Sequence, residues 1–470
     1  MNKIPNDINA IHAKPKTPGA VYFLGIGGIG MSAIARYYNS KGVRVSGYDK
    51  TPTVLTRTLE QEGISIHYTD DIALADTNAD FIVYTPAIPQ QHAELKYFKD
   101  NGFTLYKRSD VLGMITSNTF NICIAGTHGK TTTSAMVAHI LMHSKFGCTA
   151  FLGGVASNYG TNFMQSYNGV CVVEADEYDR SFLKLQPDVA VVTTMDADHL
   201  DIYGTEESMQ DAFLEFVAGV KPGGTLIVKS DIKRLKEFKA SNVLTYSLEN
   251  TSANIYASDL QMHDGSYRFN AHVNGEMIQA LVLHMGGMHN VENALAAIAV
   301  AKQLTINPEA IKEALATFTG VKRRFEYVLK SKNFVLIDDY AHHPEELRAL
   351  ISGAKKLFPG KYCTVVFQPH LFSRTQDHVA GFAEVLSIAD ETILLPIYPA
   401  RELPIPGVQS SIIEERMSNA THAIINHSDV VSYFENWQTH TEGDVVIVAG
   451  AGDIDTLVLP LKKTFENKIV

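Results

Sequence analysis

Short hydrophobic runs recur along the chain, and three of them lead through a polar or glycine-rich corner into a segment with the spacing of an amphipathic helix. They are VYFLGIGGIGMSAIARYYNSKG at 21–42, NICIAGTHGKTTTSAMVAHILMHS at 121–144 and NFVLIDDYAHHPEELRALISGAKKLF at 333–358. A buried strand followed at once by a helix is typical of parallel α/β domains. We therefore predict that each of these segments opens an α/β domain.

Further hydrophobic runs end in acidic or polar residues. In the middle of the chain these runs are GVCVVEADEYD at 169–179, DVAVVTTMDADHLD at 188–201 and GTLIVKSD at 224–231, and in the last third they are KYCTVVFQPH, ETILLP and GDVVIVAGAGD. Ligands of open α/β sheets bind beyond the carboxyl ends of the strands, so acids at these ends mark candidate sites. Residues 254–283 alternate polar and apolar positions instead, which predicts antiparallel strands joined by the turns Asp264-Gly265 and Asn274-Gly275.

The length of 470 residues, at roughly 150 residues per domain, favours about three domains. We predict an α/β fold throughout, with an N-terminal Rossmann-like parallel sheet in 1–116, a central P-loop-like α/β domain in 117–325 and a C-terminal Rossmann-like α/β domain in 326–470. The alternating segment at 254–283 would extend the central domain.

Composition narrows the possible classes of protein. A formal charge of −11 argues against a general nucleic-acid binder, because phosphate backbones are held mainly by Lys and Arg. The four cysteines lack any C-x-x-C pair, so neither a zinc site nor a disulfide framework is indicated. Residues 1–19 lack the apolar core of a signal peptide, and no apolar run approaches the roughly 18 residues of a membrane span. We expect a cytoplasmic protein without nucleic-acid or membrane partners.

The clearest chemical signal is a glycine-rich loop that follows a strand and opens a helix. Its residues are Gly126, Thr127, His128, Gly129, Lys130, Thr131 and Thr132. In a P-loop the lysine reaches the outer phosphates of the nucleotide and the next hydroxyl binds magnesium. Ile124 stands where the full G-x-x-x-x-G-K-[ST] pattern has its first glycine. A turn that merely links a strand to a helix needs no lysine followed by three threonines, so we predict that the loop binds ATP and Mg²⁺.

A second glycine loop lies near the N-terminus. Gly25, Gly27 and Gly30 are the three glycines of a G-x-G-x-x-G pattern, and Gly28 occupies one of its variable positions. Asp49 ends the next predicted strand. This arrangement predicts a dinucleotide site at the start of a helix. The alternative is a close helix–strand turn that holds no ligand.

The shortened loop GTHGKTT resembles that of the Mur ligases, the ATP-dependent amide-forming enzymes of peptidoglycan precursor assembly. EADEYDRSFL, DADHLDIYG, GGMHNVENALAA, VKRRFEY, DDYAHHPEEL, FQPHLFSRT and PIPGV agree with the family in the same order along most of the chain. They are most similar to its alanine-adding branch. The resemblance implies that ATP and Mg²⁺ are cofactors and that UDP-N-acetylmuramate and L-alanine are substrates.

The resemblance also implies roles for individual residues. The sugar nucleotide would be held by the Gly25–Gly30 loop, Asp49 and Thr85, and metal ions by Thr131, Glu174 and His199. ATP would further contact Asn290, Asn293, Arg324 and Asp339, and alanine would contact Tyr340, His342 and Arg374. Read from the residues alone, His199 is better explained as a hydrogen-bonded structural histidine. Asn290 and Asn293 could as easily be a helix cap, and Arg324 could be part of a solvated basic linker.

In the chemistry implied by the resemblance, the lactyl carboxylate of the sugar attacks the γ-phosphoryl group, and the alanine amine then attacks the acyl phosphate. Lys130, Glu174, His199 and Arg324 would serve this reaction. Some relatives have a second arginine at the position of Leu371, so carboxylate recognition would rest on fewer charges here. The alternatives are a ligase that attaches a recycled peptide to the same sugar nucleotide, a nicotinamide oxidoreductase and a non-enzymatic P-loop switch. The sequence leaves the oligomeric state open.

Overall fold

The computed structural model describes residues 17–198, 200–400, 402–418 and 421–469. The chain divides into two compact units. The first unit contains the described residues up to Ser258, together with Ala271–Gln279 and Glu292–Leu315. The second contains Asp259–Asn270, Ala280–Val291 and the described residues from Ala316 onward. The predicted domain boundaries at 116/117 and 325/326 stay a prediction.

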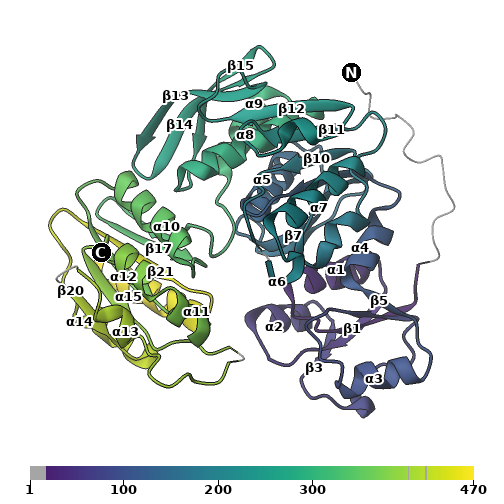
Figure 1. Ribbon diagram of the computed structural model, residues 1–470, viewed down its shortest axis with the longest axis horizontal. Coiled ribbons are helices and arrows are strands. Elements are labelled where there is room, and N and C mark those ends of the chain that lie inside the picture. Colours follow the sequence, from purple (N-terminus) through teal and green to yellow (C-terminus); the bar gives the residue numbers. More distant parts are fainter. Residues whose placement is uncertain (1–16, 199, 401, 419–420, 470) are drawn as a thin grey trace. The chain divides into compact units, whose positions relative to one another are not determined.

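The N-terminal part of the first unit is a parallel sheet with helices between its strands (Figure 1). Its elements are β1 (Ala20–Leu24), α1 (Ile29–Ser40), β2 (Arg44–Tyr48), α2 (Val54–Gln61), β3 (Ser65–His67), β4 (Phe81–Tyr84), α3 (Ala93–Asp100), β5 (Leu105–Lys107) and α4 (Arg108–Thr116). The strand order is β3-β2-β1-β4-β5, and every pairing is parallel. This is the predicted Rossmann-like arrangement, in which the strand order across the sheet reverses between β1 and β4.

The second sheet is built from the middle of the chain. Its elements are β6 (Phe120–Ala125), α5 (Lys130–His143), β7 (Thr149–Ala156), β8 (Thr161–Met164), β9 (Val170–Glu174), β10 (Val189–Val192), α6 (Leu200–Tyr203), α7 (Glu206–Ala218), β11 (Thr225–Lys229), β12 (Asn242–Ser247), β13 (Ile255–His263), β14 (Ser266–Val273), β15 (Glu276–Leu283), α8 (Met288–Gln303) and α9 (Pro308–Thr317). The order is β15-β14-β13-β12-β11-β10-β6-β9-β7-β8. β6 lies between β9 and β10 with both pairings parallel, so the chain leaves the sheet for α5 from a central strand.

The predicted antiparallel segment is confirmed as two consecutive hairpins. β13 and β14 are joined by Asp264-Gly265, and β14 and β15 by Asn274-Gly275. All four turn residues have positive φ, between +44° and +89°. A two-residue turn with positive φ at both positions matches the twist of the strands it joins, which is why Asp-Gly and Asn-Gly are favoured there.

The third sheet lies in the second unit. Its elements are β16 (Glu326–Lys330), β17 (Phe334–Asp339), α10 (Pro344–Leu357), β18 (Tyr362–Phe367), α11 (Phe372–Asp377), α12 (Val379–Leu386), β19 (Glu391–Leu394), α13 (Ser411–Glu414), β20 (Thr421–Ile424), α14 (Val430–Asn436), β21 (Asp444–Ala449) and α15 (Val458–Ile469). The order is β16-β17-β21-β18-β19-β20, parallel except for the edge strand β16. α10 begins as predicted, with Pro344 in its first turn and a capping box between His343 and Glu346.

One buried cluster joins the first sheet to the second within the first unit. It includes Phe23 and Ile34 from β1 and α1 together with Phe151 and Val173 from β7 and β9. α1 packs against both β7 and β8. The two sheets therefore share one hydrophobic core. No helix in the described part of the chain is long and apolar enough to span a membrane.

Candidate active site

The loop between β6 and α5 can be formed only by glycine at its two bends. Gly126 has φ +134° and Gly129 has φ +83°. A Cβ added at Gly126 would lie 2.0 Å from the hydroxyl oxygen of Thr193, and one added at Gly129 would lie 2.6 Å from Oδ1 of Asn293. The first unit thus brings Asn293, predicted from a distant segment, against the glycine loop.

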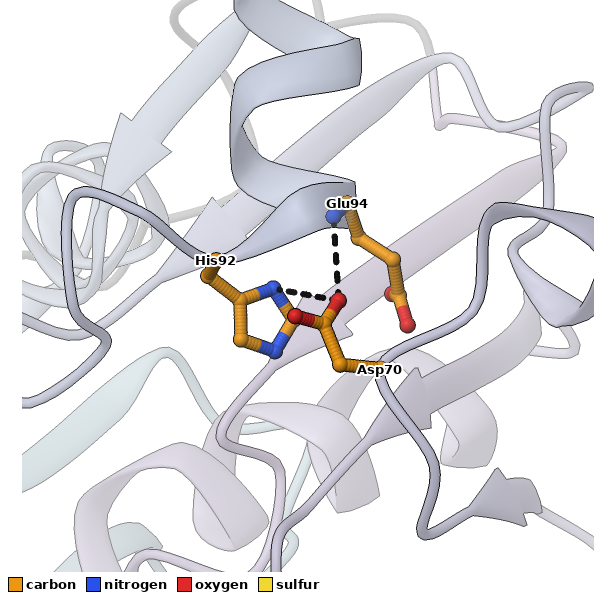
Figure 2. A group of neighbouring side chains, drawn as sticks. All are labelled: Asp70, His92 and Glu94. Atoms are coloured by element: carbon orange, nitrogen blue, oxygen red, sulfur yellow. Dashed lines mark hydrogen bonds and ion pairs between the residues drawn. The ribbon is translucent and has the colours of Figure 1, made fainter.

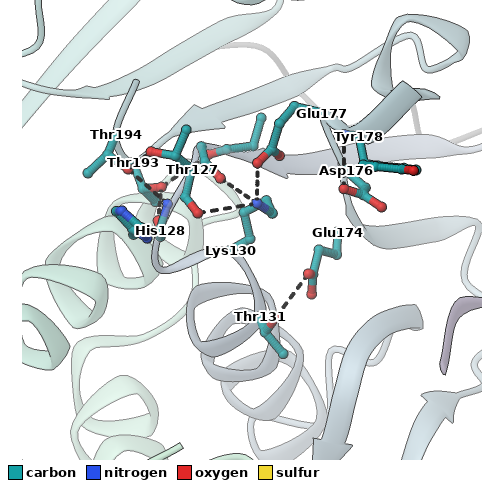
Figure 3. Close-up of polar contacts among 12 residues, drawn as sticks. Thr127, His128, Lys130, Thr131, Glu174, Asp176, Glu177, Tyr178, Thr193 and Thr194 are labelled. Carbon is teal, nitrogen blue, oxygen red and sulfur yellow. Dashed lines mark hydrogen bonds and ion pairs between the residues drawn. The ribbon is translucent and has the colours of Figure 1, made fainter. Parts of the chain in front are cut away.

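The start of α5 offers backbone N–H groups to an anion. Gly129 is the N-cap and makes no side-chain cap, and the first N–H groups of a helix have no carbonyl partner inside it. On the other side of the loop, the N–H groups of Thr127 and His128 donate to the carbonyl oxygen and to Oγ1 of Thr194, at 3.1 and 2.9 Å. Threonines after β10 therefore fix the loop while the N-terminus of α5 stays suited to phosphate (Figure 3).

Lys130 points back along the loop. Its Nζ donates to the carbonyl oxygen of Gly126 at 2.7 Å and to Oε1 of Glu177 at 2.7 Å (Figure 3). The Glu177 side chain has no exposed surface, and burial raises the pKa of this carboxyl group while the charge of Lys130 opposes the rise. Glu177 is not among the predicted site residues, because an acid three residues after Glu174 has no signature of its own.

Thr131 and Glu174 form the predicted oxygen pair. The Thr131 hydroxyl donates to Oε1 of Glu174 at 2.9 Å, and the N–H of Gly153 donates to Oε2 at 2.8 Å. Burial raises the pKa of Glu174, and the charge of Lys130 is the first influence that opposes it. A hydroxyl and a carboxylate beside a phosphate loop fit the oxygen preference of Mg²⁺. His199, the third predicted ligand, lies outside the described residues.

The N-terminal glycine loop is fixed by the residues predicted to share its site. The N–H of Gly27 donates to Oδ2 of Asp49 at 2.8 Å. A Cβ added at Gly25 would lie 2.7 Å from the methyl group of Thr85. Gly28 is the N-cap of α1 and makes no side-chain cap, so the helix N-terminus is available to a pyrophosphate. Asp49 therefore stabilises the backbone of this loop, whether or not it also contacts a ligand.

Arg108 also lies in this region, although the sequence analysis did not predict it as a site residue. A Cβ added at Gly30 would lie 2.9 Å from Nη1 of Arg108, while Nη2 of Arg108 lies 3.3 Å from Oδ2 of Asp176. Arg108, Glu174 and Asp176 line one small cavity with Ser109, Leu112, Ser181, Phe182 and Leu185. The arginine thus connects the glycine loop of the first sheet to the acids that follow β9. No local pattern marks it, since an arginine after a short strand is usually solvated.

In the second unit, Asp339 shapes the backbone around it. Its carboxylate accepts from the N–H groups of Phe325 and Ala341, both at 2.7 Å, and burial raises its pKa. The guanidinium groups of Arg323 and Arg324 lie 5.0 and 5.8 Å from the centre of the Tyr340 ring. The predicted residues Arg324, Asp339 and Tyr340 are therefore gathered at one end of β17.

Arg323 makes more polar contacts with the surrounding protein than Arg324, the neighbouring residue that was predicted to contact ATP. It donates to the carbonyl oxygen of Gly450 and lies 3.5 Å from Oδ2 of Asp455 and 3.9 Å from Oδ2 of Asp338. Asp338 is buried, which raises its pKa to about 7, whereas the charge of Arg323 opposes the rise. Arg323 thus anchors the segment that leads into β16 and leaves Arg324 as the less constrained of the two arginines.

A cluster of cationic and aromatic side chains lies beyond β18. The rings of His342 and His370 are 6.1 Å apart, and His370 stacks on Tyr398 at 5.8 Å. Burial lowers the pKa of His342, with Arg374 among the charges that add to the effect. Within the described residues, Nη1 of Arg374 and Nδ1 of His370 are buried and have no hydrogen-bond partner. A buried guanidinium N–H group such as that of Arg374 suits an anionic group of a ligand.

His370 was also missed, although it lies in the FQPHLFSRT segment that carries Arg374. The backbone of Leu371 next to it has φ +71°, which is unusual for a branched side chain.

Asn290, predicted to contact ATP, is buried in the second unit and donates from Nδ2 to the carbonyl oxygen of Gly286 at 2.6 Å. The bond ties the first turn of α8 to the backbone that precedes it, and the predicted contact with ATP stays a prediction.

Asp70, His92 and Glu94 form a separate polar group beside the first sheet (Figure 2). Nδ1 of His92 lies 3.2 Å from Oδ1 of Asp70. The carboxylate of Asp70 accepts from the N–H groups of Ala93 and Glu94, at 2.8 and 3.1 Å, where α3 begins. The positive end of a helix disfavours a cation. We interpret this group as a helix cap and not as a metal site.

Three family models match consecutive parts of the chain. A Mur ligase family catalytic domain matches 20–119, a Mur ligase middle domain matches 124–301 and a Mur ligase glutamate ligase domain matches 323–452. The chain belongs to the Mur ligase family. The expected α/β architecture and the recognition of the family from its loop are thereby confirmed, and Mur ligases are ATP-dependent enzymes.

Relatives of this Mur ligase extend over nearly the whole chain. A UDP-N-acetylmuramate–L-alanine ligase from Porphyromonas gingivalis is 45% identical over 95% of this chain and 99% of its own length. The crystal structure of a UDP-N-acetylmuramate–alanine ligase from Thermotoga maritima is 27% identical, has a TM-score of 0.82 and covers 96% of this chain and 99% of its own. A murein peptide ligase from Psychrobacter arcticus shares the fold, with a TM-score of 0.66 and 23% identity, and covers 95% of this chain and 99% of its own.

Proposed function

We propose that this Mur ligase joins L-alanine to the lactyl carboxylate of UDP-N-acetylmuramate at the expense of ATP. The observation that carries this proposal is the 45% identity to a UDP-N-acetylmuramate–L-alanine ligase over 95% of the chain. The geometry agrees with an ATP-dependent reaction, because Lys130 and the N-terminus of α5 lie at the end of a central parallel strand. We place the proposed reaction in the cytoplasm.

The reaction needs ATP because a carboxylate and an amine do not condense in water. A carboxylate oxygen of the sugar attacks the γ-phosphorus, the bond to the β-phosphate oxygen breaks and ADP leaves. The alanine nitrogen then attacks the acyl carbon, phosphate leaves and the nitrogen loses a proton. Lys130 and the first N–H groups of α5 would hold the phosphates and offset their charge.

Thr131 and Glu174 would hold Mg²⁺, with His199 as the third proposed ligand. The ion would supply positive charge to the phosphate oxygens during transfer. Support for this role comes from the 2.9 Å contact between the Thr131 hydroxyl and Glu174 next to the phosphate loop. Asn293, which lies against Gly129, and Arg324 are further proposed contacts of ATP.

The sugar nucleotide would place its pyrophosphate at the N-terminus of α1. The Gly25–Gly30 loop leaves room for close approach of the phosphates, and Asp49 and Thr85 fix its shape. Arg108 would add positive charge on the path from this loop toward Glu174.

Alanine would bind in the second unit. Arg374 is proposed to meet its carboxylate, with Tyr340 and His342 beside it, and the partnerless Nδ1 of His370 makes that ring a further candidate. A nicotinamide oxidoreductase would leave Lys130 and Glu174 without a role, and a P-loop switch would not need the cluster around Arg374. The peptide-recycling ligase is disfavoured because the curated relatives add alanine.

Phosphate release from ATP tests the function when each substrate is withheld in turn. We expect release only with UDP-N-acetylmuramate and L-alanine together, and a lower rate with serine, glycine or a tripeptide in place of alanine. Lys130→Ala should lower release by roughly two orders of magnitude or more and leave uridine nucleotide binding intact. Lys236→Ala, at an exposed lysine, is the matched control and should keep the full rate. Full turnover by Lys130→Ala would contradict the assignment of the loop.

A further inference from the structure

Among the described residues, the Lys130–Glu177 pair is the most deeply buried ion pair beside the phosphate loop. Oε1 of Glu177 lies 2.7 Å from Nζ of Lys130, the Glu177 side chain has no exposed surface and that of Lys130 is 14% exposed. A buried carboxylate of this kind is retained only with a close positive partner or a bound proton. Nothing in the reaction proposed above uses Glu177.

Charged groups from several elements surround Glu177 in the described part of the chain. α5 contributes Lys130, and the segment after β9 contributes the acids Asp176 and Asp179. From α6, the hydroxyl of Tyr203 donates to the backbone carbonyl oxygen of Glu177 at 2.6 Å, while the guanidinium of Arg180 lies over the ring of Tyr203, 5.4 Å from its centre. From α5, Nζ of Lys130 donates directly to the carboxylate of Glu177.

A triphosphate would compete with Glu177 for this lysine. Lys130 has three N–H donors, and two of them are directed to the Gly126 carbonyl oxygen and to Glu177 at 2.7 Å, while the carbonyl oxygen of Thr127 lies at 3.5 Å. The P-loop lysine is the group that reaches the outer phosphates of a bound nucleotide. Several negative charges would then lie on the far side of one ammonium group.

We propose that Glu177 is the counter-ion of Lys130 before ATP binds and takes up a proton when ATP binds. The proposal rests on the proposed function, because it takes ATP as the ligand of this loop. Once protonated, Glu177 no longer offsets the charge of Lys130, so the full positive charge of the lysine acts on the phosphates. Glu177 is thus a positioning residue, which acts on the nucleotide through Lys130.

The direction of the linkage follows from burial and charge. Burial already raises the pKa of Glu177, and Lys130 is the largest influence that holds it down. Phosphates beside Lys130 weaken this opposition and add negative charge, so the pKa of Glu177 rises further in the complex. The complex then holds more protons than the free enzyme, and ATP affinity increases as the pH falls, by at most about tenfold per pH unit for one proton.

Calorimetry with the full-length protein tests the proposal. A non-hydrolysable ATP analogue with Mg²⁺ is titrated into the wild type and into Glu177→Gln in two buffers that differ in ionisation enthalpy, which gives the protons taken up per nucleotide. Protons gained or lost by the analogue itself are common to both proteins and cancel in the difference. We expect the wild type to take up more protons than Glu177→Gln, and the affinity of the variant to depend less on pH. Equal proton uptake by the two proteins would overturn the proposal.

Two further variants serve as controls for the calorimetry. Asp179→Asn removes a carboxylate from the same segment whose side chain is 42% exposed, and it should keep the wild-type proton uptake. Glu177→Asp keeps a carboxylate but shortens it, so uptake should persist with a shifted pH midpoint; this variant serves if Glu177→Gln does not fold, and an unshifted midpoint would contradict the proposal. Failure of the wild type to bind the analogue would instead contradict the proposed function.

Discussion

Side chains from β1, β3 and α3 form a chain of hydrogen bonds, and the number of protons in this chain follows from its donors and acceptors. The hydroxyl of Tyr22 lies 2.7 Å from Nε2 of His67 and 2.5 Å from Oε2 of Glu94, and Nδ1 of His67 lies 2.9 Å from the carbonyl oxygen of Thr69. A neutral His67 that donates from Nδ1 can only accept at Nε2. One hydroxyl proton cannot serve both neighbours, so a second proton on Glu94 completes the chain. Burial accordingly raises the pKa of Glu94 to about 7.

The protonation of Glu94 predicts how stability changes with pH. Its pKa is higher in the folded chain, at about 7, than the ordinary 4.5, so the folded state holds this proton more tightly. The stabilisation is fully present below about pH 4.5 and is lost as the pH rises toward 7, by up to about 3 kcal/mol. We expect the unfolding free energy of the wild type to fall relative to that of Glu94→Gln over this interval, as measured by urea unfolding at several pH values.

A neighbouring acid provides the control for this measurement. Asp100 lies at the exposed end of the same helix, α3, and Asp100→Asn should keep the pH dependence of the wild type. If Glu94→Gln and the wild type changed in parallel with pH, the proposed proton on Glu94 would be wrong.

At the scale of elements, the junction of β6 and α5 depends on the conformation of a single glycine. Gly129 has φ +83°, and a Cβ there would point at Asn293 on α8. An alanine would be strained by its φ and would also displace Asn293 from the loop. The loop geometry is therefore set jointly by its own backbone and by a helix that comes much later in the chain.

Two glycine substitutions distinguish the effect of backbone strain at positive φ from the effect of displacing Asn293. Gly129→Ala and Gly102→Ala each place an alanine at positive φ, but a Cβ at Gly102 would meet nothing within 4 Å. The positive φ should cost each variant about 1 kcal/mol of stability, because alanine disfavours this backbone conformation, and Gly129→Ala should lose more because its Cβ would displace Asn293. Only Gly129→Ala should also lose ATP-dependent phosphate release. Thermal unfolding and the phosphate assay, run on both variants, check the prediction, and equal losses of activity would refute it.

At the scale of the whole molecule, the proposed chemistry is divided between the two units. Lys130 and Glu174 belong to the first unit, whereas His342 and Arg374 belong to the second. In the proposed reaction, an acyl phosphate formed beside Lys130 is attacked by an amine held near Arg374, so we expect the two units to close over the substrates.

Small-angle scattering tests this closure in solution. We expect the radius of gyration to decrease when a non-hydrolysable ATP analogue and UDP-N-acetylmuramate are both present, because closure would also keep water away from the acyl phosphate. Either ligand alone should produce a smaller change. Identical dimensions with and without the ligands would count against closure.

The sequence by itself determined the elements and the kind of chemistry. Strand-to-helix junctions, the Asp-Gly and Asn-Gly hairpins and the proline that begins α10 depend on local backbone preferences, so nearby residues are enough to predict them. The glycine loop that carries Lys130 is likewise contiguous, and it led to the correct family.

Only the tertiary structure decided which distant residues meet at the loops. Glu177 pairs with Lys130, Arg108 lies between Gly30 and Asp176, and His370 lies beside His342, although none of the three carries a local signature. These contacts depend on strand order and on the direction of each side chain after packing, which a linear pattern does not contain. Local physics fixed where each strand ended, and the packing of the sheets fixed which charges faced one another there.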